Sequence, residues 1–222
     1  MGVYLEKGIE GEIELKQPGL TDRIITAMNL EGANPKDTPA EGGTLPKDED
    51  GEQCDENFNY ASVVGMLLYL QGHSRPDITF AVNQCARYCF NPKNSHEKAV
   101  KRIGRYLLGT KDKGLILKPS GELKIDCYVD SDFAGLWGYE KPDDTSSVKS
   151  RTGFMIQVKK CPISWTSKLQ TEISLSTMEA EYVALITAMR DLIPMMDIIM
   201  EVFNSVGLKK VDEPSIVSTV WE

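Results

Sequence analysis

The hydrophobic and polar positions of this chain follow two different periods, and the change falls near residue 121. Upstream, apolar residues recur every three or four positions in several segments, as they do on the buried face of a helix. From Gly121, the stretch LKIDCYVDSD alternates strictly, which is typical of a half-buried strand. The inner face of this strand is expected to carry Leu123, Ile125, Cys127 and Val129, and the outer face Lys124, Asp126, Tyr128, Asp130 and Asp132.

The N-terminal part of the chain contains two short elements and a long irregular stretch. Residues 3–16 break into apolar and charged pieces around two glycines, which predicts a β-hairpin. Pro18 is expected to open a short helix that completes a region of residues 1–30, with one apolar stripe of Leu20, Ile24 and Met28. Residues 31–56 combine prolines, glycines and acids without periodicity, which predicts an acidic surface loop or linker.

Residues 57–120 are expected to form a segment of three helices, with the sequences YASVVGMLLYLQ, RPDITFAVNQCARYCF and SHEKAVKRIGRYLLG. The third helix carries the apolar residues Val100, Ile103 and Leu107 on one side. A basic stripe on another side consists of Lys98, Lys101, Arg102 and Arg105. Such a stripe either contacts a phosphate backbone or forms an ordinary solvated helix face.

Residues 121–222 predict the element order β-β-β-α-β. Two short strands, TGFMIQV and CPISWTS, follow the first strand and are separated by a turn at Lys159 and Lys160. A long helix is expected from Ser176, broken or restarted at Pro194, and the stretch SIVSTVWE reads as a final strand. The predicted fold class is α/β of the α+β kind, with a helical segment followed by a mixed sheet and packed helices.

Composition narrows the class of protein only slightly. The net charge of −8 and the pI of about 5.0 argue against an evenly basic surface, but a local basic stripe survives that average. The five cysteines include no CxxC pair, which favours a reducing compartment and buried thiols over a zinc site at Cys85 and Cys89. The sequence shows no signal peptide and no transmembrane run, so we expect an intracellular protein of the cytoplasm or nucleus.

Two glutamates stand close together in the stretch SLSTMEAEYVAL. Ser176 and Glu179 have the spacing of a capping box, in which the serine binds the helix amide and the glutamate reaches back to the cap. Glu181 instead falls in line with the apolar stripe of Ala184, Leu185, Ala188 and Leu192. An inward carboxylate is costly unless it is paired, protonated or bound to a cation. Glu181 is therefore either a ligand or a residue at the edge of the stripe whose carboxylate reaches water.

A strand that ends in Asp130 and Asp132 provides further carboxylates. A helix packed on that strand can bring Glu181 within reach of the same divalent cation. Hard oxygen ligands of this kind suit Mg²⁺, which retains waters and bridges phosphates. The pattern suggests a metal-dependent phosphodiester hydrolase, although acids on one strand and one helix occur often.

Several motifs of this chain carry a family resemblance. YVDSDFAG, SRTGF and CPISWTSKLQTEISLSTMEAEYVAL resemble the ribonuclease H domain in the Pol polyprotein of copia-type LTR retrotransposons. Upstream, NYASVVGMLLYLQGHSRPDITFAVNQCARY and KRIGRYLLGTKDKGL are similar to the segment that links the reverse transcriptase palm and thumb to ribonuclease H. The resemblance covers nearly the whole chain apart from residues 31–56. It implies a helical thumb-like or connection-like segment followed by a ribonuclease H-like sheet.

The resemblance also implies site residues. Domains of this family use four acids around two Mg²⁺ ions, with Mn²⁺ as a possible substitute, to cut the RNA strand of an RNA/DNA hybrid. Asp130 matches the first acid, and Asp132 is the alternative ligand or a turn residue. Glu181 matches the second acid, because alanines follow it three and seven positions later.

The third and fourth acids of the family pattern are expected beyond Glu222, and the polymerase aspartates upstream of the hairpin. We therefore expect a truncated fragment, incomplete at the C-terminal end of its sheet domain, whose partners are an RNA/DNA hybrid and the remainder of the polyprotein. No membrane and no small-molecule cofactor are expected. Three hypotheses remain open: an active ribonuclease H module, a non-catalytic remnant that binds nucleic acid, and a product that does not accumulate. In the second, the basic stripe would act with the aromatic residues Tyr106, Trp137 and Tyr139.

Overall fold

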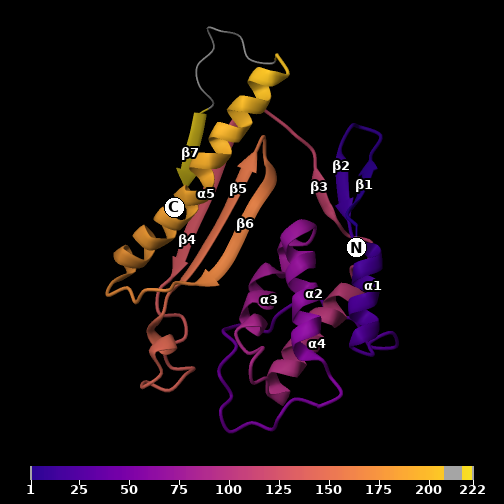
Figure 1. The fold of residues 1–222 in the computed structure, drawn as a ribbon, viewed down its shortest axis with the longest axis vertical. Helices are drawn as coiled ribbons and strands as arrows, with labels where there is room; N and C mark the ends of the chain where they lie inside the picture. The colour runs from indigo at the N-terminus through magenta and orange to yellow at the C-terminus, as the bar shows by residue number, and fades with distance from the viewer. Residues whose placement is uncertain (1, 208–216, 222) are drawn as a thin grey trace. The chain divides into compact units, whose positions relative to one another are not determined.

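The structure is a computed structural model that describes residues 2–207 and 217–221. The chain forms two compact units, which are considered separately (Figure 1). Unit 1 comprises residues 1–117 and 136–147, and unit 2 comprises residues 118–135 and 148–222. Both units combine helices and strands, so the predicted α+β fold class is confirmed.

Unit 1 begins with a small antiparallel sheet. The strands are β1 (Tyr4–Lys7), β2 (Ile13–Lys16) and β3 (Leu115–Leu117), in the order β1-β2-β3. The predicted hairpin is thus confirmed. Strand β3 was not anticipated, because three consecutive apolar residues are too few to show an alternation.

The helices of unit 1 pack around one core. They are α1 (Pro18–Ala27), α2 (Tyr60–His73), the 3₁₀ turn η1 (Pro76–Ile78), α3 (Thr79–Ala86) and α4 (Asn94–Leu108). Helix α2 begins where the Asn59 side chain accepts a bond from the amide of Ser62, since Asn is a good N-cap. Gly104 lets α4 approach closely, because a Cβ there would lie 2.5 Å from the sulfur of Met28. The fully buried side chains include Ile24, Val64, Leu67, Leu70, Ile78, Val82, Val100, Ile103 and Leu107.

The acidic loop of residues 31–56 contains no helix and no strand, as predicted, and it is held against the helices by its backbone. The amide of Cys54 donates to the carbonyl of Pro92 at 3.2 Å, and the amide of Lys36 donates to the carbonyl of Arg105 at 3.2 Å. The loop is therefore part of the packed unit along its length.

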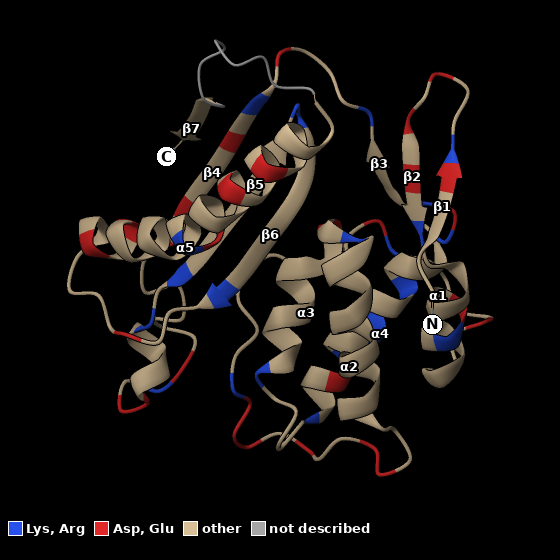
Figure 2. Cartoon of the chain, turned by 45° about the horizontal axis from the view of Figure 1, so that its top comes forward, with Lys and Arg blue, Asp and Glu red and all other residues tan. Residues whose placement is uncertain are grey.

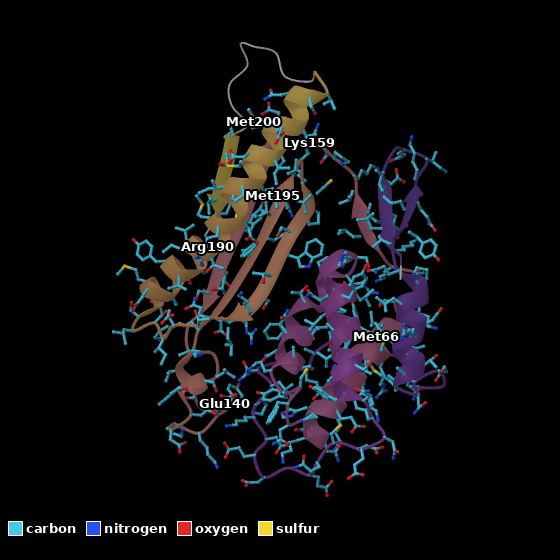
Figure 3. All side chains as sticks on the ribbon, in the orientation of Figure 1. Met66, Glu140, Lys159, Arg190, Met195 and Met200 are labelled. Carbon is cyan, nitrogen blue, oxygen red and sulfur yellow. The ribbon has the colours of Figure 1, made fainter. Side chains whose placement is uncertain are left out.

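Residues 136–147 join unit 1 although the residues on both sides of them in the sequence, 118–135 and 148–222, belong to unit 2. Their anchor is Glu140, which Figure 3 labels and whose side chain is only 1% exposed. Its Oε1 atom lies 2.6 Å from Nη2 of Arg87 and accepts a bond from the Tyr88 hydroxyl at 3.3 Å. Ser146 donates to the second carboxylate oxygen. The ion pair between Glu140 and Arg87 therefore holds residues 136–147 to the helices of unit 1.

Unit 2 is a four-stranded mixed sheet with one helix on it. The strands are β4 (Lys124–Asp132), β5 (Arg151–Val158), β6 (Cys161–Leu169) and β7 (Val217–Trp221), in the order β6-β5-β4-β7. Strand β7 is parallel to β4, and the other pairs are antiparallel. The turn η2 (Thr145–Val148) precedes β5, and α5 (Thr177–Ser205) covers one face of the sheet (Figure 1). The predicted order β-β-β-α-β is confirmed.

The core between α5 and the sheet follows the predicted alternation. It comprises Ile125, Cys127, Val129, Phe154, Ile156, Ala184, Ala188 and Leu192, all below 10% exposure. One position of the alternation is wrong: Leu123 lies just before β4 and is 36% exposed. The strand pairing that would fix its side chain inward begins only at the next residue.

Helix α5 runs without interruption through Pro194, so the predicted break is wrong. Proline lacks the N–H that would bind the carbonyl of Arg190, one turn earlier. Figure 3 labels Arg190 and Met195 on either side of this point. Met195 and Met196 are half-buried against the core of unit 2, so packing on the sheet offsets the missing bond. In the part of the chain that the structure describes, no helix has the length and apolarity needed to cross a membrane.

Candidate functional site

Asp130 lies near the carboxyl end of β4, a strand with neighbours on both sides. It pairs with Gly153 of β5, and its side chain is exposed. Side chains alternate along a strand, so Asp130 projects from the face opposite to Val129, which packs on α5. A Cβ built on Gly153 would meet no atom closer than the Asp130 carbonyl oxygen at 4.0 Å. The space beside the Asp130 carboxylate is therefore open.

Asp132 ends β4 opposite Arg151 and is also exposed. Its carboxylate folds back over Gly135, where an added Cβ would collide with both carboxylate oxygens. This position suits the turn role that was the alternative to metal binding. Asp126, on the same face of β4, is engaged: it lies 2.7 Å from Nζ of Lys124 and accepts a bond from the Trp221 indole at 2.9 Å. Hydrogen bonds from Lys124 and Trp221 lower the pKa of Asp126.

The start of α5 positions the second predicted carboxylate. The Ser176 hydroxyl accepts a bond from the amide of Glu179 at 3.2 Å, as the capping box predicts. The return bond differs from the prediction, because Glu179 accepts from the amide of Leu175 at 2.7 Å and not from that of Ser176. Glu179 is exposed and serves the helix terminus.

Glu181 is half-buried, and its Oε2 atom is inaccessible to solvent. The buried line of α5 runs through Ala180, Ala184, Ala188 and Leu192, so Glu181 flanks this line and does not lie at its centre. Figure 2 shows acidic positions on both β4 and α5. Among residues 2–207 and 217–221, no three His, Cys, Asp or Glu side chains converge as a metal-binding group. Asp130 and Glu181 also start from opposite faces of the sheet, because α5 packs on the face that carries Val129. By residue type alone, carboxylates with waters and phosphates match the ligands that Mg²⁺ takes in proteins.

A row of large side chains crosses the sheet on the face that carries Asp130. Trp221 pairs with Tyr128, Tyr128 with Met155, and Met155 with Trp165. The rings of Tyr128 and Trp221 stack with centroids 6.4 Å apart, and both residues are more than 40% exposed. Trp165 is half-buried within the sheet.

The predicted basic stripe of α4 is already engaged by the chain itself. Nζ of Lys101 lies 2.5 Å from Oε1 of Glu97, one helical turn away. Burial of Glu97 raises the pKa of its carboxyl, but the bonds from Lys101 and the Asp55 amide outweigh that effect, and the pKa is lowered. Lys98 is exposed and forms no hydrogen bond or ion pair with the described residues.

The acidic loop of residues 31–56 engages two more basic residues of α4. Arg102 donates from Nη1 to Glu41 at 2.7 Å and from Nη2 to Thr38 at 2.8 Å. Arg105 donates from Nε to the carbonyl of Asn34 at 2.6 Å. The local sequence pattern gives no sign of these contacts, because they join positions more than 60 residues apart.

The other candidate residues in unit 1 have mixed environments. The Tyr106 hydroxyl donates to Asp77 at 2.8 Å, whereas Trp137 and Tyr139 are 59% and 58% exposed. Cys85 is buried, which raises the pKa of its thiol to about 12. Cys89 is half-buried, and its thiol pKa is also raised by burial. Both thiols behave as packing groups at neutral pH.

Comparison with known proteins gives relatives by sequence. The chain is 34% identical over 82% of its length to the retrovirus-related Pol polyprotein from transposon RE2 of Arabidopsis thaliana, of which it covers 12%. It is 37% identical over 77% of its length to the Pol polyprotein from transposon TNT 1-94 of Nicotiana tabacum, of which it covers 13%. An uncharacterized mitochondrial protein of Arabidopsis thaliana is 30% identical over 83% of the chain, which covers 72% of that protein. No family model matches the chain, and no solved structure matches it.

Proposed function

Since this chain corresponds in sequence to a segment of the retrovirus-related Pol polyproteins of transposons, we propose that it is the junction between reverse transcriptase and ribonuclease H of a copia-type polyprotein. In this proposal unit 1 contains the thumb-like or connection-like helices, and unit 2 is the ribonuclease H-like domain. The substrate is the RNA strand of an RNA/DNA hybrid. The chain spans about one eighth of the length of these polyproteins, so their full activity is not assigned to it.

One observation carries the proposal. An exposed aspartate, Asp130, lies near the carboxyl end of strand β4, and a half-buried glutamate, Glu181, lies on the helix that packs on that strand. The empty space at Gly153 leaves room beside Asp130 for a ligand. Strand order β6-β5-β4-β7, with β7 parallel to β4, supports a mixed sheet of the kind that the resemblance implies.

The donor chemistry fits Mg²⁺. Asp130 leaves the face of β4 opposite to α5, so a cation shared with Glu181 would have to lie at the carboxyl end of β4, where Gln170 links Ser131 to Ala180 in the first turn of α5. Both residues would hold it through carboxylate oxygens, and Mg²⁺ when bound polarises water and neutralises a leaving phosphate oxygen. Two-metal hydrolysis requires further fixed ligands, and none joins these two residues within the described part of the chain. We therefore propose that this segment binds the metal but does not cut the hybrid by itself. The remainder of the polyprotein would supply the missing acids.

A second candidate function is binding of nucleic acid without hydrolysis. The exposed Lys98 and the neighbouring Lys101, Arg102 and Arg105 would contact phosphates, once the partners of the last three are displaced. The contact of Arg102 with Glu41 is weak enough for displacement, because the Glu41 side chain is 82% exposed. Binding of this kind weakens steeply as salt increases.

The test uses the purified chain, a labelled RNA/DNA hybrid, and Mg²⁺ or Mn²⁺. The double variant Asp130→Asn, Glu181→Gln is expected to lose metal binding that the wild type shows, while Asp132→Asn is expected to retain it. None of the three proteins, the wild type included, is expected to cut the hybrid. Cleavage by the wild type that the double variant abolishes would show that two carboxylates suffice here. Equal metal binding by the wild type and the double variant would overturn the assignment of both ligands.

A further inference from the structure

Gln170 makes an unusual set of contacts directly after β6. The residue is 5% exposed. Its Nε2 atom lies 2.9 Å from the carbonyl oxygen of Ala180 in α5, 3.1 Å from Oγ1 of Thr152 in β5 and 3.4 Å from Oγ of Ser131 in β4. One buried amide group therefore touches the two central strands of the sheet and the helix that packs on them.

The side-chain oxygen and the backbone amide of Gln170 are also bonded. Its side-chain oxygen accepts a bond from the Ser174 hydroxyl at 3.0 Å, and its backbone amide donates to the carbonyl of Ser150 at 2.9 Å. Buried polar groups that are fully hydrogen-bonded have a defined orientation and are costly to disrupt. The nitrogen and the oxygen of the side-chain amide are therefore both fixed, and Gln170 forms a rigid link between β4, β5 and α5.

The position of this connection relates it to the two candidate ligands. Ser131 directly follows Asp130, and Ala180 directly precedes Glu181. The Ser131 side chain alternates with that of Asp130, so it faces α5 while Asp130 faces the open side of the sheet. Gln170 bonds to the Ser131 hydroxyl and to the backbone carbonyl of Ala180, so it links the residue next to Asp130 with the residue next to Glu181.

We propose that Gln170 is a positioning residue that sets the separation of Asp130 and Glu181. The inference rests on the proposed function, because it assigns a role to Gln170 through those two ligands. Gln170 itself binds neither metal nor substrate. Residues that orient metal ligands typically change metal affinity by about 10- to 100-fold when they are replaced.

Two variants separate positioning from general stability. Gln170→Met keeps the length of the side chain and removes its N–H donors. Leu192→Ala is the matched control, because Leu192 is buried in the same core and lies 12 residues beyond Ala180, or about 18 Å along the helix. It destabilises unit 2 without touching the bonds of Gln170. Ser174→Ala removes only the bond that orients the amide and provides a milder variant.

The first measurement is hydrogen exchange of the full chain without metal. In Gln170→Met, the amides of residues 180–184 and the end of β4 are expected to exchange faster relative to the rest of unit 2. In Leu192→Ala, the loss of protection is expected to be spread over the unit. Equal protection of these amides in the wild type and in Gln170→Met would overturn the proposal.

The second measurement is Mn²⁺ affinity, determined by electron paramagnetic resonance. We expect a 10- to 100-fold weaker affinity in Gln170→Met, unchanged affinity in Leu192→Ala, and loss of binding in Asp130→Asn, Glu181→Gln. Unchanged affinity in Gln170→Met, with loss in the double variant, would overturn the positioning role and leave the proposed function intact. A wild type that binds no Mn²⁺ would count against the proposed function, and the exchange pattern would still decide whether Gln170 restrains the two elements.

Discussion

Asp130 of β4 lies directly across from Gly153 of β5, in a pair where the glycine leaves the space beside the aspartate unfilled. Side chains at paired positions of adjacent strands lie on the same face of a sheet and about 5 Å apart. Any side chain at position 153 would therefore stand next to the carboxylate that we assign to metal binding. The glycine is not required by the fold, because its φ is not positive and an added Cβ meets no clash.

Gly153→Val is expected to separate folding from metal binding. The free energy of unfolding should change by less than about 1 kcal/mol, because valine suits a strand and fits the open space. Affinity for Mn²⁺ should fall several-fold, because the branched side chain crowds Asp130. Urea unfolding and Mn²⁺ titration check the two halves of the prediction. Unchanged affinity in a folded variant would remove Gly153 from the site.

Glu140→Gln is expected to destabilise unit 1 strongly. The substitution keeps the size of the side chain but leaves Arg87 without its buried counter-charge. Breaking one partner of a buried ion pair costs about 3 to 5 kcal/mol. Lys141→Ala is the control, because Lys141 is exposed and forms an ion pair with Glu49, a kind of contact worth about 0 to 1 kcal/mol. Chemical denaturation of both variants should show this contrast, and similar losses would contradict it.

Glu41→Gln is expected to increase affinity for nucleic acid without a loss of stability. The change frees Arg102, while the exposed ion pair contributes less than about 1 kcal/mol to folding. At low ionic strength, fluorescence anisotropy should show about two- to fivefold tighter binding of a labelled RNA/DNA hybrid, since one more cation is available to phosphates. Glu56→Gln makes the same charge change in the same loop. Equal gains in both variants would mean that only net charge matters.

Acid is expected to destabilise the protein through His96. Burial lowers the pKa of this imidazole from its ordinary value of 6.5, although its bond to the Pro46 carbonyl and the charge of Asp48 oppose the shift. The unfolded chain therefore takes up the proton more readily, so the stability present above pH 6.5 is lost as the pH falls toward the folded-state pKa. Protonation would also abolish the bond that His96 Nδ1 accepts from the amide of Lys93.

Urea unfolding at pH 7.5 and pH 5.5 checks this behaviour. Between those values the wild type should lose more stability than His96→Gln, which does not titrate. His73, the other histidine, is exposed, so His73→Gln should follow the wild type. A wild type and a His96→Gln variant with the same pH dependence would show that other groups control acid unfolding.

The turn between β5 and β6 offers a stabilising substitution. Its two central residues, Lys159 and Lys160, have φ angles of 49° and 66°, and Figure 3 labels Lys159. Positive φ at both positions is typical of a type I′ turn, which favours Asn-Gly and strains other residues by about 1 kcal/mol or more. The double change Lys159→Asn, Lys160→Gly should raise the unfolding free energy by about 1 kcal/mol. Lys160→Val should lower it, and thermal unfolding measures both.

Much of the local structure could be predicted from the sequence. The alternation of Ile125, Cys127 and Val129 fixed which face of β4 is buried, because a strand has a period of two. The spacing of Ser176 and Glu179 located the start of α5, because a capped terminus depends only on neighbouring residues. The helix break predicted at Pro194 was wrong, because packing of the surrounding turns on the sheet outweighs one missing hydrogen bond.

The contacts that could not be predicted from the sequence join residues that are far apart along the chain. Lys98, Lys101, Arg102 and Arg105 are readily recognised as a basic stripe, but only the folded chain shows that three of them already have partners. The segment 136–147 gave no sign in the sequence that it would join unit 1 through Glu140. Contacts of this kind depend on which surfaces meet after folding.

The candidate site shows the same division. Sequence by itself determined the elements that carry Asp130 and Glu181 and the face of β4 from which Asp130 projects, because periodicity is a property of the local backbone. It placed Glu181 within the apolar stripe of α5, whereas the residue flanks the buried line. Only the tertiary structure decided that Gly153 leaves space beside the aspartate and that Gln170 bonds to Ser131 and Ala180. The physical reason is that a hydrogen bond between separate elements forms only after the packing of the core has brought those elements together.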